Sequence, residues 1–201
     1  MRRLFVSFML ILLLTIPAIS SGGDAVPTDL AAPKKVVVIG DSLSTGFGLA
    51  TPWTEQFANS LQVELVNAAV KNQETLFGLN LIEAVLSKEK PSHVIILMGT
   101  NDAVRGSVSN ALINLQKMVD IGRAHNAQVV LGTLPYIHGN PWQDNQAKMI
   151  SDRVPYIKGA YVADIRARFG TDKSLYADAI HPNEAGQSAI AEVFLSLFSA
   201  P

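Results

Sequence analysis

Short apolar stretches alternate with longer amphipathic stretches along most of this chain. Strands are predicted where β-branched and other apolar residues run together, and helices where apolar residues recur at helical spacing. The predicted strands are Lys35–Ile39, Val63–Asn67, Val94–Met98, Val129–Leu131 and Tyr161–Ala163. The predicted helices are Trp53–Leu61, Leu76–Lys88, Val108–His125, Asp144–Val154 and Glu184–Phe198.

This alternation is typical of βαβ units around a parallel sheet. The sequence therefore predicts an α/β fold, a flavodoxin-like three-layer sandwich with a five-stranded parallel sheet. The order of the strands follows from that analogy and not from the periodicity itself. No internal repeat or second domain is apparent in the 201 residues.

The N-terminus has a different pattern. The basic pair Arg2-Arg3 precedes an apolar run over Leu4–Ile16 and the segment Pro17-Ala18-Ile19-Ser20. This pattern predicts a cleaved Sec signal peptide over 1–20, a flexible leader over 21–33 and one domain over 34–201, in a periplasmic or secreted protein. An uncleaved anchor is the alternative, but the run is shorter than the ~20 apolar residues that span a bilayer.

Composition narrows the classes of function. The formal net charge of -1 gives no basic footprint for nucleic acid. The chain has no cysteine, which excludes disulfides, a thiol nucleophile, thiolate metal sites and lipoprotein acylation. Gly46-Phe47-Gly48 lacks the third glycine of a dinucleotide loop, and no His and carboxylate cluster has metal-ligand spacing, so we expect no cofactor and no metal.

Polar clusters follow apolar runs at what should be one edge of the sheet. They are Gly40-Asp41-Ser42, Gly99-Thr100-Asn101-Asp102 and Asp178-Ala179-Ile180-His181. We expect Ser42 to lie in a small-residue loop beside a helix N-terminus, whose N–H groups stabilise negative charge.

Serine catalysis needs a nucleophile, a base, a group that orients the base, and donors for the oxyanion. The clusters supply Ser42 as nucleophile, His181 as base and Asp178 as orienting acid. The Asn101 amide and the Ser42 backbone N–H are the expected oxyanion donors.

Each cluster also has a simpler explanation. Ser42 could cap the next helix, Asn101 and Asp102 could be turn formers, and Asn183 could cap the last helix. Capping explains the joint occurrence of the clusters, in this order, much less well.

The three clusters resemble blocks I, III and V of the GDSL, or SGNH, hydrolases, and the likeness extends from Lys35 to Phe198. More narrowly, the chain is similar to the bacterial thioesterase I/lysophospholipase L1 and arylesterase group. The resemblance implies a flavodoxin-like esterase domain with Ser42 as nucleophile and His181 as base. Asp178 would be the third triad member, and Asn101 would donate its side-chain N–H to the oxyanion.

One position departs from the family pattern. The family carries a glycine whose backbone N–H completes the oxyanion hole, and Asn72 stands there in this chain. Asparagine tolerates left-handed geometry best among the other residues, so the Asn72 N–H could still serve. If close approach matters more, the Asn72 side chain would crowd the acyl group.

Several aromatic and histidine side chains are secondary candidates. Phe47, Tyr136 and Trp142 could line an acyl or aryl pocket, with core packing as the alternative for Trp142. We expect Trp53 in the core, and His93 and His125 in structural or surface positions. His138 could compete with His181 as base, although no acid lies near it in the sequence.

These observations predict an exported serine esterase that acts on a small-molecule ester through an acyl-enzyme on Ser42. Short acyl esters, aryl esters, thioesters and lysophospholipids all fit, and the last would bring the protein into peripheral contact with lipid. The alternatives are a carbohydrate O-acetylesterase of the cell envelope and a non-catalytic binding protein on the same scaffold.

Overall fold

Parallel strands form the centre of the structure, a computed structural model that describes residues 30–46 and 51–198. The strands are β1 (Lys35–Gly40), β2 (Glu64–Asn67), β3 (His93–Leu97), β4 (Gln128–Gly132) and β5 (Ala160–Ala163). They form a single five-stranded sheet in the order β2-β1-β3-β4-β5, with every neighbouring pair parallel. The flavodoxin-like strand order expected by analogy is therefore confirmed.

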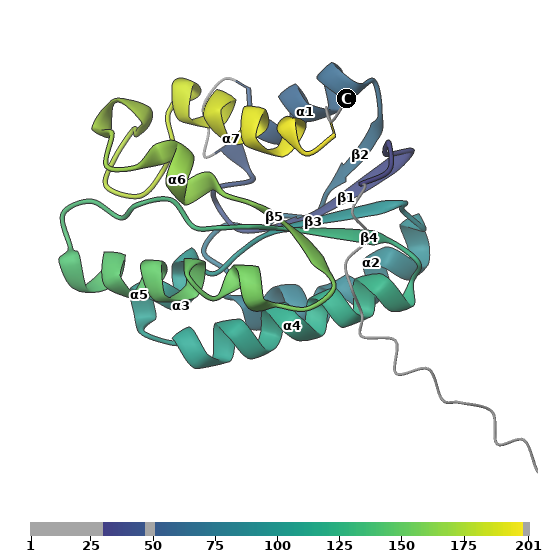
Figure 1. Ribbon diagram of the computed structural model, residues 1–201, viewed down its shortest axis with the longest axis horizontal. Helices are drawn as coiled ribbons and strands as arrows, with labels where there is room; N and C mark the ends of the chain where they lie inside the picture. The colour runs from purple at the N-terminus through teal and green to yellow at the C-terminus, as the bar shows by residue number, and fades with distance from the viewer. Residues whose placement is uncertain (1–29, 47–50, 199–201) are drawn as a thin grey trace, which may run out of the picture.

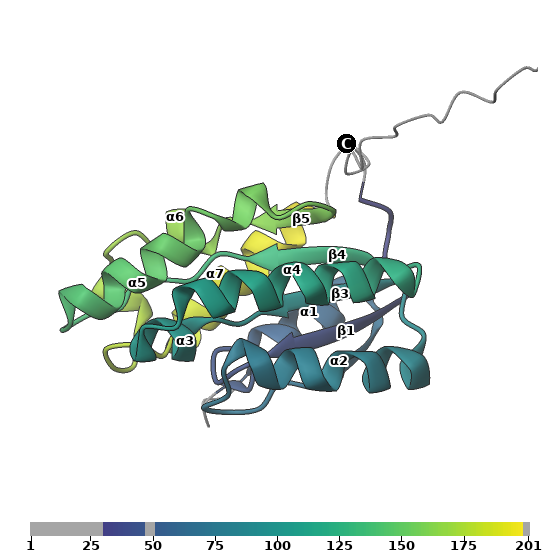
Figure 2. The same cartoon turned by 90° about the horizontal axis from the view of Figure 1, so that it is seen from below.

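Helices cover both faces of this sheet. They are α1 (Trp53–Leu61), α2 (Thr75–Glu89), α3 (Thr100–Arg105), α4 (Val108–Ala124), α5 (Pro141–Ser151), α6 (Ile165–Phe169) and α7 (Glu184–Ser196), with short 3-10 helices η2 (Val154–Tyr156) and η3 (Lys173–Leu175). Figure 1 shows α1, α6 and α7 on one face and α2, α3, α4 and α5 on the other. Seen from below, α2 and α4 lie side by side beneath the sheet (Figure 2). The three-layer sandwich is confirmed.

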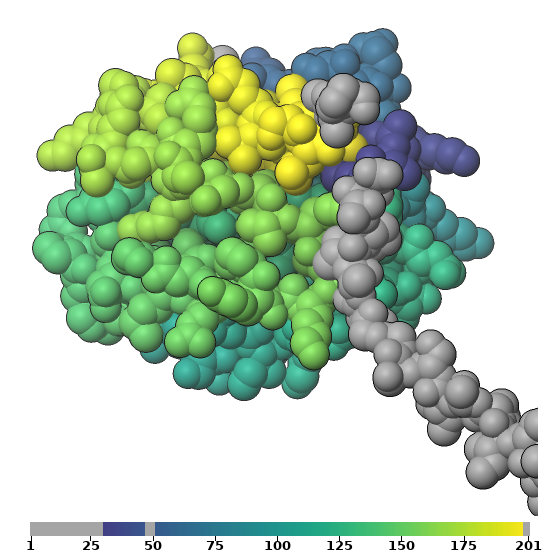
Figure 3. Space-filling model, viewed as in Figure 1, coloured from purple at the N-terminus to yellow at the C-terminus, as the bar shows by residue number. Residues whose placement is uncertain are grey.

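The core consists of apolar side chains between the layers. The central strands β1 and β3 are almost fully buried, as expected for parallel strands covered on both faces. On the upper face, the Trp53 ring stacks on Phe194 with a centroid distance of 4.6 Å, and Phe57 packs edge-on against Trp53. The expected core position of Trp53 is confirmed, and α7 fills the surface between α6 and α1 (Figure 3).

The strand register places the site. Gly40 at the end of β1 pairs with Leu97 of β3, so the chain leaves both strands at neighbouring points. The crossover after β1 runs over one face through α1, and the crossover after β2 runs over the other through α2. Strand order therefore reverses between β1 and β3, which is where α/β sheets bind ligands.

The sequence missed or misplaced several elements. α3 and α6 were not predicted, because each is too short to show a periodic pattern. α5 begins at Pro141 and not at Asp144, because Asn140 accepts a hydrogen bond from the Gln143 N–H and Pro141 occupies the first helical turn. Residues Ser42–Thr45 form a turn, the residues at 47–50 lie outside the described part of the chain, and α1 begins at Trp53.

The predicted signal peptide and most of the predicted leader lie outside the described residues. Within the part of the chain that the structure describes, no helix is both long enough and apolar enough to cross a bilayer.

Candidate active site

Ser42 lies in the tight turn that follows β1. The Asp41 backbone carbonyl accepts a hydrogen bond from the Ser44 N–H at 3.1 Å, and an Asp41 carboxylate oxygen accepts one from the Leu43 N–H at 3.0 Å. Only 4% of the Ser42 surface is exposed. Because the cap position of α1 is Pro52, the capping role considered for Ser42 is excluded.

His181 and Asp178 lie in the loop between η3 and α7. This loop is closed by the backbone hydrogen bond from Ala177 to His181 at 2.8 Å, and Tyr176 and Pro182 form an isolated β-bridge. Asn183 then caps α7 by accepting a hydrogen bond from the Gly186 N–H. The predicted cap is therefore confirmed. Capping by Asn183 does not conflict with a catalytic role for Asp178 and His181.

The three side chains form a continuous line. The His181 Nε2 lies 3.1 Å from the Ser42 Oγ, and the His181 Nδ1 lies 2.7 Å from Oδ2 of Asp178. The other Asp178 oxygen accepts hydrogen bonds from the backbone N–H groups of Ile180 and His181, both at 2.7 Å. The carboxylate is thus fixed by its own loop.

These contacts set the charge of Asp178. Partial burial raises its pKa, but the hydrogen bonds from His181 and Ile180 and the adjacent imidazole outweigh burial, and the net pKa lies below its usual range. A charged carboxylate accepts only, so the His181 Nδ1 must donate to it. In the neutral imidazole the Nε2 is then the acceptor that faces the Ser42 hydroxyl, as a general base requires.

Asn101 lies on α3, directly after β3. Its side-chain nitrogen donates a hydrogen bond to the Gln73 backbone carbonyl at 3.0 Å. An amide nitrogen carries two N–H groups, so this contact orients the group and leaves a second N–H for a substrate oxygen.

Asn72 has a φ of 61°, which is left-handed. This is the geometry for which glycine is usually chosen, and asparagine adopts it at the lowest cost among the other residues. The Asn72 side chain is exposed and lines a recess of about 380 Å³ with Leu76, Phe77 and Arg105.

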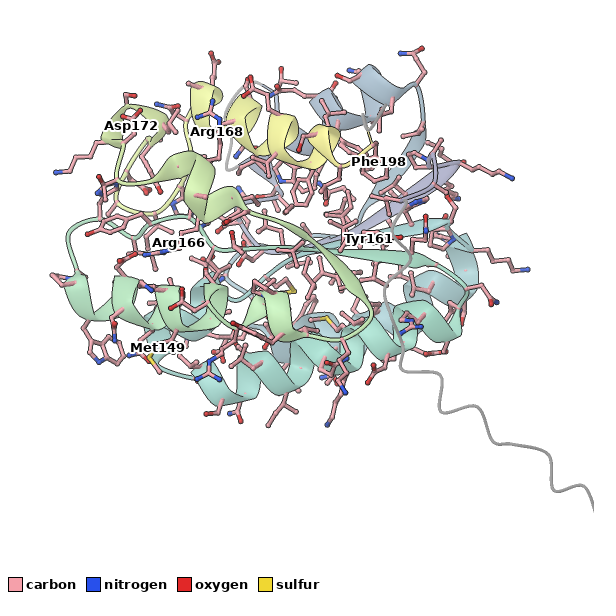
Figure 4. The ribbon with its side chains drawn as sticks, viewed as in Figure 1. Met149, Tyr161, Arg166, Arg168, Asp172 and Phe198 are labelled. Atoms are coloured by element: carbon pink, nitrogen blue, oxygen red, sulfur yellow. The ribbon has the colours of Figure 1, made fainter. Side chains whose placement is uncertain are left out.

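Two of the three aromatic residues expected to line a pocket lie in the described part of the chain. Phe47 lies outside the described residues. Trp142 is on the first turn of α5, 54% exposed and with its ring against Gly106, so the core alternative for Trp142 is wrong. Tyr136 lies beneath the Arg166 guanidinium, 5.6 Å from the ring centroid, and lines a cavity of about 760 Å³ between α5 and α6. Arg166, which is labelled in Figure 4, lines the same cavity and pairs with Asp144 at 2.8 Å.

The remaining histidines have other surroundings. The ring of His138 packs between Tyr136 and Tyr176, and burial lowers its pKa. Its backbone N–H donates to the Ala179 carbonyl at 2.8 Å, so this residue supports the loop that carries Asp178. His93 is buried at the start of β3, at the opposite edge of the sheet, and His125 pairs with Glu83 after α4.

The sequence missed two buried carboxylates beneath these loops. Asp102, considered only as a turn former, is 1% exposed and accepts hydrogen bonds from the Thr75 N–H at 2.9 Å and the Thr75 hydroxyl at 2.7 Å. Asp41 is fully buried, and one of its oxygens has no hydrogen-bond partner among the described residues. Burial and the nearby charge of Asp102 raise the pKa of Asp41 to about 7, against hydrogen bonds from the backbone of Leu43 and Thr100. The only sequence signal for either residue is its place directly after a buried strand.

No group of three or more His, Asp or Glu side chains within residues 30–46 and 51–198 has the arrangement of a metal site.

Comparison with known proteins also indicates an ester hydrolase. The sequence model of the GDSL-like Lipase/Acylhydrolase family matches residues 38–189. Esterase TesA of Pseudomonas aeruginosa is 31% identical over 176 residues, covering 82% of this chain and 88% of that protein. An arylesterase of Vibrio mimicus is 26% identical over 176 residues, covering 80% of this chain and 86% of that protein.

A crystal structure of TesA has the same fold. It matches with a TM-score of 0.72 at 26% identity, covering 82% of this chain and 97% of that chain. From the family match and the extent of these similarities, we conclude that this chain belongs to the GDSL-like lipase/acylhydrolase family, whose members are serine hydrolases that act on esters.

Proposed function

We propose that this protein hydrolyses carboxylic esters through an acyl-enzyme on Ser42, with His181 as general base and acid and Asp178 as the group that orients it. The observation that carries this proposal is the 3.1 Å approach of His181 Nε2 to Ser42 Oγ, with Asp178 on the far side of the same ring at 2.7 Å. These are the distances over which a base removes a hydroxyl proton.

The reaction has two halves. His181 takes the proton of Ser42 while the hydroxyl oxygen attacks the ester carbonyl, and the imidazolium then protonates the leaving alcohol. Water attacks the acyl-enzyme in the same way, with His181 again as base, and releases the acid and free Ser42. Asp178 holds the productive tautomer and stabilises the imidazolium in both halves.

The carbonyl oxygen becomes negative in each half and needs donors. The backbone N–H of Ser42, the side-chain amide of Asn101 and the backbone N–H of Asn72 are the donors that we assign. Preorganised donors of this kind are worth ~10²–10³ in rate each. The left-handed backbone at Asn72 supports this assignment, because it keeps the conformation for which other family members use glycine.

For the substrate, we propose short acyl and aryl esters. The recess beside Asn72, about 380 Å³, supports a small acyl group or a single aromatic ring, and its lining includes the exposed apolar side chains Leu76 and Phe77. The similar Vibrio mimicus protein is an arylesterase by name, which agrees with this preference.

The direct test is hydrolysis of a p-nitrophenyl acyl series by the wild type and by Ser42→Ala. We expect turnover by the wild type, highest for the shorter chains, and a loss of at least about a thousandfold in Ser42→Ala. Ser44→Ala is the matched control, because Ser44 is also buried in the same turn and its hydroxyl has no partner among the described residues. Equal turnover by Ser42→Ala and the wild type would refute the mechanism.

The same series also tests the class of substrate. Acetylated xylose oligomers and lysophosphatidylcholine are assayed beside the p-nitrophenyl esters at matched enzyme concentration. Faster release of acetate from the sugar would replace our proposal with a carbohydrate O-acetylesterase. Faster cleavage of the lysophospholipid would replace it with a lipid substrate.

We also propose that the protein is exported and cleaved near Ser20. The basic pair Arg2-Arg3, the apolar run Leu4–Ile16 and the small residues that follow support this proposal. Fractionation of cells that express the full chain, followed by intact-mass measurement, should find a periplasmic or secreted form that lacks about 20 residues. A full-length protein confined to the cytoplasm would refute export.

A further inference from the structure

The segment that leads into α2, residues Asn72–Thr75, is held by a buried carboxylate from another element. Asp102 of α3 accepts the Thr75 N–H at 2.9 Å on one oxygen and the Thr75 hydroxyl at 2.7 Å on the other. The Asn114 side chain of α4 donates to the same hydroxyl oxygen at 3.0 Å. The Asp102 carboxylate and the Thr75 and Asn114 side chains are all buried, and all three take part in one network.

Two further contacts join the same segment to α3. Asn101 donates its side-chain N–H to the Gln73 carbonyl at 3.0 Å. Arg105 pairs with Glu74 at 2.8 Å, with the guanidinium half exposed. The exposed pair contributes little, since surface ion pairs are worth about 0–1 kcal/mol. The buried Asp102 contacts are therefore the strong attachment.

This attachment lies three residues from the left-handed backbone of Asn72. Glycine would adopt this left-handed conformation without steric strain, because it has no Cβ. Asparagine adopts it at some cost in free energy. The chain therefore needs a fixed neighbour to hold the peptide of Asn72 in one orientation. Thr75, anchored through both its N–H and its hydroxyl, is such a neighbour.

We infer that Asp102 is a positioning residue, which acts through Thr75 to hold the backbone N–H of Asn72 in line with the oxyanion that forms at Ser42. This inference rests on the proposed function. Asp102 does not touch the substrate. It fixes the α2 end of the segment on which a donor lies, just as its chain neighbour Asn101 fixes the middle of that segment and supplies a second donor.

A purely structural role is the rival explanation. Glu74, at the cap position of α2, makes no capping hydrogen bond with its side chain, so the Asp102 carboxylate supplies the missing acceptor from outside the helix. A cap of this kind contributes about 1 kcal/mol to the free energy of unfolding and nothing to the rate constant of the folded enzyme. The two roles therefore differ in their effect on kcat.

The test uses Thr75→Val and Thr75→Ser with a p-nitrophenyl ester. Valine has the shape of threonine but lacks the hydroxyl, and serine keeps it. Misplacing a reacting group by about 1 Å costs up to ~10²-fold, so we expect Thr75→Val to lower kcat about 10- to 100-fold with KM changed less than about threefold. Thr75→Ser should restore kcat to within about threefold of the wild type.

Thr133→Val is the matched control. The Thr133 hydroxyl donates to the Asp164 carboxylate at 2.9 Å, and Asp164 caps α6, so this is a second Thr–Asp pair at a helix N-terminus. Thr133→Val should lower the unfolding midpoint in urea about as much as Thr75→Val does, while its kcat stays within about threefold of the wild type. A Thr75→Val enzyme with the same loss of stability and an unchanged kcat would overturn the inference and leave Asp102 as a cap alone.

A double-mutant cycle identifies Asp102 as the partner. If Thr75 acts through Asp102, Thr75→Val and Asp102→Ala together should lower kcat no more than Asp102→Ala alone, because removing the carboxylate already removes the acceptor of the Thr75 hydroxyl. Fully additive losses would contradict the inference. Failure of the proposed function would give a different result. The wild type would lack esterase activity, or the Ser42→Ala variant would retain it. The inference on Asp102 would then fail as well.

Discussion

The imidazole Nε2 of His181 lies 3.1 Å from the hydroxyl Oγ of Ser42, although 139 positions separate the two residues in the chain. Parallel strands create this proximity. β1 delivers Ser42 to the carboxyl edge of the sheet, and α7 begins at the same edge, so the loop before α7 brings His181 over the β1 turn.

The Asp178 carboxylate should be needed for its charge and not only for its shape. Asp178→Asn keeps the volume but offers an N–H to the His181 Nδ1 and favours the wrong tautomer. We expect kcat to fall about 10²–10⁴-fold, as losing the orienting acid does in other triads. Asp172→Asn is the control, because Asp172 (labelled in Figure 4) makes a similar local turn by accepting a hydrogen bond from the Ser174 N–H at 2.9 Å. An unchanged kcat in Asp178→Asn would contradict the assigned role.

Asn72 should be replaceable by glycine but not by alanine. Glycine adopts a φ of 61° freely, whereas alanine in left-handed geometry costs about 1–2 kcal/mol. Asn72→Gly should keep kcat within a few fold of the wild type, and Asn72→Ala should lower both kcat and the urea midpoint. Steady-state kinetics and urea unfolding measure both effects. A tenfold loss in Asn72→Gly would show that the asparagine side chain itself takes part.

The strands could be predicted from the sequence, and the short helices could not, for physical reasons. Runs such as Val36–Ile39 and Val94–Leu97 predicted their strands, because parallel strands buried on both faces need continuous apolar residues. The short helix α3 could not be predicted, because six residues carry less than two turns of pattern.

For the site, the order of the polar clusters predicted which side chains come together. Their support could not be predicted, because the burial of Asp41 and Asp102 depends on packing between elements distant in sequence. The position of Trp142 was also not predictable from its neighbours in the sequence. Its loop-like surroundings in the sequence are compatible with a pocket or a core position, but it lies on the exposed first turn of α5 because Asn140 starts that helix early.

Asp41 should make stability depend on pH. Its pKa rises from 3.8 to about 7 on folding, because burial and the nearby Asp102 disfavour its charge. Between pH 4 and pH 7 the folded protein keeps a proton on Asp41 that the unfolded chain releases. The contribution of Asp41 to the free energy of unfolding is therefore fully present below pH 4 and is lost as pH rises through 7. The total is on the order of a few kcal/mol, since one pKa unit is worth about 1.4 kcal/mol.

Asp41→Asn isolates this contribution because it cannot ionise. The free energy of unfolding of the variant, minus that of the wild type, should increase by at least about 1 kcal/mol between pH 5 and pH 8. Urea unfolding of both proteins at the two pH values measures it. The same difference at both pH values would show that Asp41 stays charged in the fold.

Gly186 should be intolerant of any side chain. A Cβ there would collide with the Leu175 carbonyl oxygen and lie 2.7 Å from the Pro182 Cβ, so the loop that carries Asp178 and His181 would have to move. We expect Gly186→Ala to lose about 1–3 kcal/mol of stability and to lower kcat of the folded enzyme at least tenfold.

Gly122→Ala serves as its control, since a Cβ there would crowd Val129 of β4, away from this loop. It should lose stability without losing kcat. Equal kcat values for Gly186→Ala and Gly122→Ala would show that the loop position tolerates the shift.

Covalent labelling tests the central claim most directly. The wild type is treated with a fluorophosphonate at neutral pH, and the adduct is located by peptide mass spectrometry, beside Ser42→Ala and His181→Ala. An activated serine attacks the phosphorus and displaces fluoride, whereas an ordinary serine does not react. We predict one adduct per wild-type chain, on Ser42, and none in either variant. An unlabelled wild type, or equal labelling of His181→Ala, would contradict the account.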